Sequence, residues 1–110
     1  MKVVIAGGRD FIPDDSDKLT LLRLHEQYKF TEIVSGCAKG ADTFGELFAE
    51  ENNISVKRFP AEWGIYGKRA GFKRNAEMAR YCNAIILFPG GNGTANMRNY
   101  ATFYGKPIIH

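Results

Sequence analysis

Five short strand-like segments recur along the chain, and glycine-rich or polar turns separate them. Val3–Ala6 and Ala84–Phe88 are continuous apolar runs, which are typical of strands buried on both faces of a sheet. Ile54–Phe59 alternates between apolar and polar residues, as a half-buried strand does. Glu32–Ser35 and Lys106–Ile109 are shorter segments of the same kind. The pattern therefore predicts about five strands.

Segments with helical spacing fill most of the intervals between these strands. They are Pro13–Tyr28, Ala41–Glu51, Phe72–Tyr81 and Thr94–Tyr104. In the second of these helices, Phe44, Leu47 and Phe48 are expected to lie on one face. Ala61–Gly71 is rich in glycine and has no clear period, so we expect an irregular loop that covers a site.

Strands that alternate with helices predict the fold class. We expect an α/β protein with a single Rossmann-like, doubly wound and mostly parallel sheet of about five strands, with helices on both faces. The length of 110 residues fits one domain, residues 1–110. In such a fold, ligands bind beyond the carboxyl ends of the strands, where the winding direction reverses.

Glycine-rich turns follow three of the expected strands at that edge. They are Gly7–Asp10, Ser35–Asp42 and Pro89–Thr94. Glycine lets the backbone come close to a ligand, and the N–H groups at a helix start face an anion placed there. One such turn is weak evidence, because glycines also serve ordinary tight turns. Three turns at one edge favour a nucleotide-like ligand whose phosphate they hold.

The side chains around these turns suggest individual roles. The hydroxyls of Ser35 and Thr94 would add donors to the backbone N–H groups, and Arg9 and Arg74 would make bidentate contacts to phosphate or ribose oxygens. Trp63 or Tyr66 would stack on a base, and Asn75 would orient a ligand hydroxyl. The alternatives are an ion pair at the surface for Arg9, an exposed helix position for Arg74, and loop anchoring for the aromatic residues. The expected ligand-binding residues are Gly7, Gly8, Arg9, Ser35, Gly36, Lys39, Gly40, Asp42, Trp63, Arg74, Asn75, Pro89, Gly90, Gly91, Asn92, Gly93 and Thr94.

Composition narrows the class of protein. The formal charge is +3, and seven of the basic residues are bunched between positions 57 and 80, which indicates either a solvated face or an anionic partner. The two cysteines, Cys37 and Cys82, are expected to be free thiols, and we expect no metal and no cofactor. No apolar run approaches the ~20 residues that cross a bilayer, and no signal peptide is evident, so we expect a cytoplasmic protein that does not contact a membrane.

Several motifs resemble those of a known family. Phe72–Arg80 followed by Pro89–Thr94 resembles the paired signature of the SLOG superfamily, which includes the Lonely Guy phosphoribohydrolases and the DNA-processing proteins of natural transformation. Gly7–Asp10, Ser35–Asp42 and Phe59–Trp63 are similar to motifs of the small YspA-related SLOG proteins. The resemblance runs over nearly the whole chain and implies the same fold, a nucleotide-like ligand and a homo-oligomer.

One position departs from the Lonely Guy pattern. Those enzymes have an arginine that falls on Arg74 and a catalytic glutamate that falls on Met97. Breaking a glycosidic bond needs a carboxylate to stabilise the oxocarbenium-like state or to activate water, and a thioether does neither. If the protein is an enzyme, we expect Arg74 to be catalytic and Asp42, Asp10 or Glu62 to supply a carboxylate from another direction. The first-turn position of Asp42 in a helix also has a purely structural explanation.

Three functions remain open at this point. The favoured function is a binding module that senses or sequesters a nucleotide or nucleotide-derived ligand. The first alternative is a nucleoside 5′-monophosphate phosphoribohydrolase, and the second is a nucleic-acid-binding protein that uses the bunched basic residues.

Overall fold

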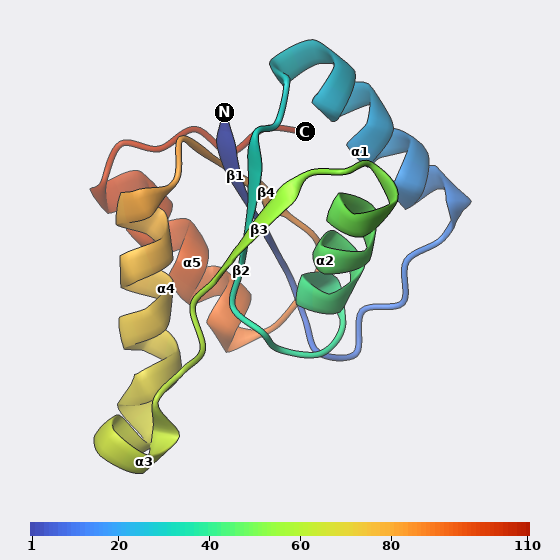
Figure 1. Ribbon diagram of the computed structural model, residues 1–110. Coiled ribbons are helices and arrows are strands. Elements are labelled where there is room, and N and C mark those ends of the chain that lie inside the picture. The colour runs from blue at the N-terminus through green and yellow to red at the C-terminus, as the bar shows by residue number, and fades with distance from the viewer.

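The structure is a computed structural model that describes all residues 1–110. A parallel sheet of four strands runs through its centre (Figure 1), formed by β1 (Lys2–Ala6), β2 (Glu32–Ser35), β3 (Ser55–Arg58) and β4 (Ala84–Leu87). The strand order is β3-β2-β1-β4, so the chain winds outward from β1 in one direction and then crosses to its other side. This confirms the α/β fold class. The sheet has four strands, because the expected last strand makes only one parallel bridge, from Ile108 to Ile85.

Helices cover both faces of the sheet. Figure 1 shows α1 (Asp15–Tyr28) and α2 (Ala41–Glu51) on one face, and α4 (Ala70–Tyr81) and α5 (Asn92–Phe103) on the other. The residues of β1 alternate between two buried clusters, with Val3 and Ile5 facing α1 and α2. Val4 and Ala6 face α4 and α5. The continuous apolar run of β1 is thus explained by burial on both faces.

Local sequence signals set the helix boundaries. The Asp14 carboxylate accepts the N–H of Asp17 at 2.9 Å, and the Asp17 carboxylate accepts the N–H of Asp14 at 2.9 Å, so a reciprocal capping box starts α1. Lys29 ends the helix in the left-handed region, with φ of 56°. On α2, Phe44 and Phe48 are buried, whereas Leu47 is 51% exposed.

The segment expected to be an irregular loop is mostly helical. It contains the single turn α3 (Trp63–Tyr66) and the 3-10 turn η1 (Gly67–Arg69), which leads directly into α4. Figure 1 shows α3 at the far end of α4, beyond the carboxyl edge of the sheet. None of the helices has both the length and the apolar composition that a membrane-spanning helix requires.

Candidate functional site

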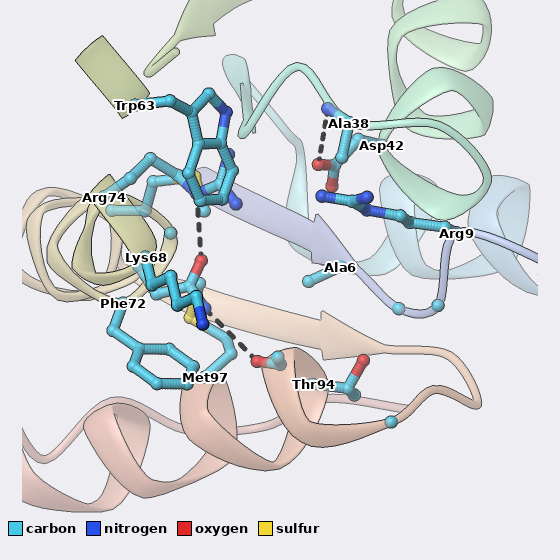
Figure 2. Close-up of a pocket in the computed structure, with 17 residues that line it drawn as sticks. Ala6, Arg9, Ala38, Asp42, Trp63, Lys68, Phe72, Arg74, Thr94 and Met97 are labelled. Carbon is cyan, nitrogen blue, oxygen red and sulfur yellow. Dashed lines mark hydrogen bonds between the residues drawn. The ribbon is translucent and has the colours of Figure 1, made fainter. Parts of the chain in front are cut away.

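A cavity of about 330 Å³, the site cavity, opens at the carboxyl edge of the sheet. It lies beside the ends of β1 and β4, where the winding direction reverses. Figure 2 shows its walls, which come from α3, α4, the first turn of α5 and the turns after β1 and β2. Its lining residues are Ala6, Gly7, Gly8, Arg9, Ala38, Asp42, Trp63, Lys68, Gly71, Phe72, Arg74, Asn75, Met78, Gly91, Gly93, Thr94 and Met97.

The site cavity brings together ten residues that the sequence singles out. These are Gly7, Gly8, Arg9, Asp42, Trp63, Arg74, Asn75, Gly91, Gly93 and Thr94. Gly36 and Lys39 line an adjoining cavity of about 500 Å³, which shares Arg9, Ala38, Trp63 and Arg74 with the first. The other five expected residues lie outside the site cavity: Ser35, Gly40, Pro89, Gly90 and Asn92.

Ser35 and Pro89 have internal partners. The Ser35 side chain is 1% exposed, and its hydroxyl donates to the Glu46 carboxylate at 2.6 Å and accepts the N–H of Cys37 at 3.1 Å. The carbonyl oxygen of Pro89 accepts the N–H of Gly8 at 2.9 Å. These groups hold the turns together, and the Ser35 hydroxyl does not face the site cavity.

Two of the glycines allow the turns to pack against one another. A Cβ on Gly90 would lie 2.0 Å from Thr94 Oγ1 and 2.6 Å from the nitrogen of Gly8. A Cβ on Gly40, whose φ is +73°, would lie 2.2 Å from the carbonyl oxygen of Gly8. Gly91 and Gly93, in contrast, would meet no atom within 4 Å if they carried a Cβ. Packing therefore explains Gly40 and Gly90 but leaves Gly91 and Gly93 unexplained.

The N-terminus of α5 presents free donors to the site cavity. The helix begins at Asn92, and its N-cap is Gly91, which has no side chain to cap the first turn. The first N–H groups of a helix have no intrahelical partner and carry the positive end of its dipole. Gly93 and Thr94 of this turn line the cavity. Such a turn is suited to bind an anion.

Asn75 on α4 fixes the position of this turn. Its side chain is buried, and its amide nitrogen donates to the carbonyl oxygen of Gly93 at 3.2 Å and to Asn96 Oδ1 at 3.0 Å. Its Oδ1 accepts the Nε–H of Arg74 at 3.1 Å. Asn75 thus joins α4 to α5 and orients Arg74, and its hydrogen bonds are made within the protein.

Arg74 and Arg9 bring two guanidinium groups to the site cavity without a carboxylate partner. Arg74 donates from Nη1 to the carbonyl oxygen of Gly36, and Figure 2 shows Arg9 reaching inward from the turn after β1. The ion pairs of the protein are Arg58–Glu46 at 2.9 Å and Lys73–Glu77 at 2.8 Å, so neither cavity arginine has a carboxylate within 4.0 Å. Burial lowers the pKa of Arg74, with a smaller opposing effect of the Asp42 charge. A partly buried cation in this position favours an anionic ligand.

Asp42, in the first turn of α2, supplies a carboxylate to the same cavity. It is 8% exposed, and its Oδ2 accepts the N–H of Ala38 at 3.1 Å. Burial raises the pKa of this carboxyl, and the Ala38 hydrogen bond and the Arg74 charge oppose that rise. The cavity therefore has three cationic side chains, Arg9, Lys68 and Arg74, and one acidic group, Asp42. Figure 2 shows Arg9, Lys68, Arg74 and Asp42 in the cavity wall.

Comparison with known proteins then identifies the family. A family model described as "YspA, cpYpsA-related SLOG family" matches residues 1–66. The chain belongs to this family. It is also similar to the Gene 61 protein of Mycobacterium phage D29, with 33% identity over 99% of this chain and 94% of that protein. The crystal structure of TM1055, a structural genomics target, shares the fold, with a TM-score of 0.74 and 19% identity over 98% of this chain and 72% of that one.

This SLOG chain has an apolar residue where the Lonely Guy pattern has its glutamate. Met97 lies on α5, is buried and lines the site cavity. Of the other carboxylates considered from the sequence, Asp10 lines only the adjoining cavity, and Glu62 lines neither of these two cavities. Asp42 is therefore the acidic residue of the site cavity.

Aromatic residues form another wall of the SLOG site. Trp63 on α3 is 51% exposed, and a Cβ on Gly71 would lie 3.3 Å from its indole, so Gly71 allows the ring to lie close to α4. Phe72 and Lys68 also line the cavity, although sequence reasoning did not assign them to it. Two features of the sequence could have indicated them: Phe72 is the first residue of the motif that contains Arg74, and Lys68 is one of the bunched basic residues. Lys73 Nζ lies over the ring of Tyr66, 4.9 Å from the ring centre. Tyr66 does not line the site cavity.

The bunched basic residues divide among several environments. Arg58 pairs with Glu46 and Lys73 pairs with Glu77. Lys57 lies over the ring of Phe59 at 5.8 Å, while Arg74 and Lys68 line the site cavity. These contacts explain much of the bunch without a nucleic-acid partner.

Proposed function

We propose that this SLOG protein binds a nucleotide or nucleotide-derived ligand in the site cavity and senses or sequesters it. One observation carries the proposal: Arg9 and Arg74, which have no carboxylate partner, face the same cavity as the uncapped first turn of α5. An anionic group bound between them would satisfy both the guanidinium groups and the helix N–H groups.

The expected interactions are strong enough for a specific site. A hydrogen bond to a charged group contributes about 1.5–3 kcal/mol, and micromolar affinity requires about 8 kcal/mol. Three or four such bonds supply much of that amount. The site cavity of about 330 Å³ is of the size expected for a small-molecule site (about 300–1,000 Å³), and Trp63 offers a surface on which a base can stack.

Isothermal titration calorimetry tests this proposal. The ligands are the four ribonucleoside 5′-monophosphates and the matching nucleosides, and the proteins are wild type, Arg74→Ala and Arg80→Ala. Arg80 is the matched control, because it is an exposed arginine of α4 that does not line the site cavity. We expect at least one monophosphate to bind wild type and Arg80→Ala, its nucleoside to bind far more weakly, and Arg74→Ala to lose about tenfold to a hundredfold in affinity. Equal binding of nucleoside and nucleotide would contradict the phosphate site.

A second candidate function is N-glycosidic hydrolysis of a nucleoside 5′-monophosphate. The observation that favours it is the Asp42 carboxylate in the same cavity as Arg74. In this reaction, water attacks the anomeric carbon of the ribose 5-phosphate while the base leaves, and Asp42 would stabilise the developing cation. Chromatographic detection of free base, present with wild type and absent with Asp42→Asn, would support hydrolysis over simple binding.

We also propose that the protein is a homo-oligomer. Phe103, the last residue of α5, is 78% exposed, so the end of this helix presents a large apolar side chain that a second copy could cover. Light scattering coupled to size exclusion would show a mass above that of the 12.3 kDa monomer.

A further inference from the structure

We propose that Asp42 selects ligands that carry free ribose hydroxyl groups. This inference rests on the proposed nucleotide-binding function and assigns a specificity-determining residue within the same site. It starts from a carboxylate whose hydrogen bonds inside the protein are incomplete.

One oxygen of the Asp42 carboxylate remains open to a ligand. Oδ2 accepts the N–H of Ala38 at 3.1 Å, and the protein provides no further hydrogen bond and no ion pair to this side chain. Every fully buried side-chain nitrogen or oxygen in the protein has a hydrogen-bond partner. Oδ1 of Asp42 has no partner, so this atom is accessible. Asp42 lines the site cavity, and Oδ1 is therefore available to a ligand there. Figure 2 shows the carboxylate in the wall of the cavity that Arg9 also lines.

The chemistry of a carboxylate determines what it binds there. An ionised carboxylate only accepts hydrogen bonds, and a phosphate offers it no donor and repels it. The phosphate of a nucleotide therefore belongs near Arg74 and the first turn of α5, and a donor group of the ligand belongs near Asp42. Ribose hydroxyls are such donors, and they lie a few bonds from the 5′-phosphate.

A carboxylate in this role has a chemical precedent. In dinucleotide-binding doubly wound folds, an acidic residue about 20 residues beyond the glycine-rich turn accepts a hydrogen bond from the ribose 2′-hydroxyl. Asp42 lies farther along the chain, in the first turn of α2, and brings the same group to the site cavity. Burial raises the pKa of this carboxyl, and the Ala38 hydrogen bond and the Arg74 charge oppose that rise.

The test compares ribonucleotides with 2′-deoxyribonucleotides by calorimetry. The probes are the four ribonucleoside 5′-monophosphates and their 2′-deoxy counterparts, and the proteins are wild type, Asp42→Asn and Glu50→Gln. Asn keeps an oxygen for the N–H of Ala38 and presents a donor where the carboxylate presents an acceptor. Glu50 is the control because it is an exposed carboxylate on the same helix outside the site cavity.

We expect wild type and Glu50→Gln to bind at least one ribonucleotide ten or more times as tightly as its 2′-deoxy form. Asp42→Asn should weaken the ribonucleotide by a similar factor, leave the deoxynucleotide nearly unchanged and reduce the ratio of the two to within about threefold. Equal binding of both sugars by wild type would overturn the inference and leave the proposed function intact. The same holds if Asp42→Asn weakens both sugars equally, as it would if Asp42 contacts the base. If none of the eight nucleotides binds wild type, both proposals are wrong. The comparison of ribonucleotides with deoxyribonucleotides on wild type remains valid even if the Asp42→Asn variant does not fold.

Discussion

At the residue scale, Gly90 and Gly93 lie in one turn but are glycine for different physical reasons. A side chain at Gly90 would collide with Thr94 and with the backbone of Gly8, whereas a Cβ at Gly93 meets no atom within 4 Å. Glycine in a helix destabilises the helix relative to alanine, by up to about 1 kcal/mol. Gly93 is in the first turn of α5 and has no packing reason. We attribute it to the close approach of the proposed ligand.

Alanine substitutions should separate these two reasons. We expect Gly90→Ala to lower the free energy of unfolding by about 1–3 kcal/mol, because the turns after β1 and β4 must move apart. Gly93→Ala should leave stability unchanged or raise it slightly, and it should weaken nucleotide binding. Thermal unfolding and calorimetry measure the two effects. Full affinity in Gly93→Ala would show that the ligand does not approach this backbone.

The raised pKa of Asp42 gives a pH dependence with a definite sign. The carboxyl has a higher pKa in the folded protein than its ordinary value of 3.8, so its ionisation disfavours the folded state as pH rises through that window. Asparagine cannot ionise and avoids this effect. We therefore expect Asp42→Asn to be at least as stable as wild type at neutral pH, with its advantage shrinking as pH falls toward about 4. Denaturant unfolding between pH 4 and 7 measures this difference, and an advantage that grows at low pH would contradict it.

At the scale of elements, α3 and η1 place aromatic and basic side chains over the site cavity. Trp63 is the one tryptophan of the chain, so its fluorescence reports on this wall alone. We expect a bound nucleotide to quench that fluorescence, because the base stacks on the indole. Trp63→Ala should lower affinity by about fivefold to a hundredfold, as stacking on an aromatic side chain contributes about 1–3 kcal/mol. Fluorescence that does not respond to saturating nucleotide would place the base elsewhere.

The regular elements were predictable from sequence because each has a local cause. Continuous apolar runs identify β1 and β4, and the Asp14 and Asp17 capping box identifies the start of α1. The turn α3 has only four residues, too few for a helical period to be visible. The spacing of residues along α2 also does not show which of them are buried. Phe44 and Phe48 are buried, whereas Leu47 is exposed.

At the scale of the whole molecule, the edge of the sheet that holds the site follows from the fold class. The turns after β1, β2 and β4 meet at the carboxyl edge in any sheet of this order, so sequence predicts that Arg9, Asp42 and Thr94 come close together. Sequence does not show which polar groups are already used internally. The partner of Ser35 is Glu46, eleven residues away on α2, and that contact exists only in the folded protein.

Phe72 and Lys68 reach the same cavity for a similar reason. Their places depend on how α3, η1 and α4 continue beyond the sheet, which the sequence pattern does not specify. Long-range packing thus accounts for the part of the site that could not be predicted. We propose that the two arginines of the assembled site and the start of α5 hold the phosphate of an intact nucleotide.

Native mass spectrometry distinguishes a nucleotide that is bound intact from one that is hydrolysed. Wild type and Arg74→Ala are incubated with the four ribonucleoside 5′-monophosphates, and each sample is scored for bound mass and for free base. We predict that wild type retains an intact nucleotide and releases no base, and that Arg74→Ala retains none. Accumulation of free base with wild type would show a hydrolase in place of a binding module. Failure of wild type to retain any nucleotide would contradict nucleotide binding in the site cavity.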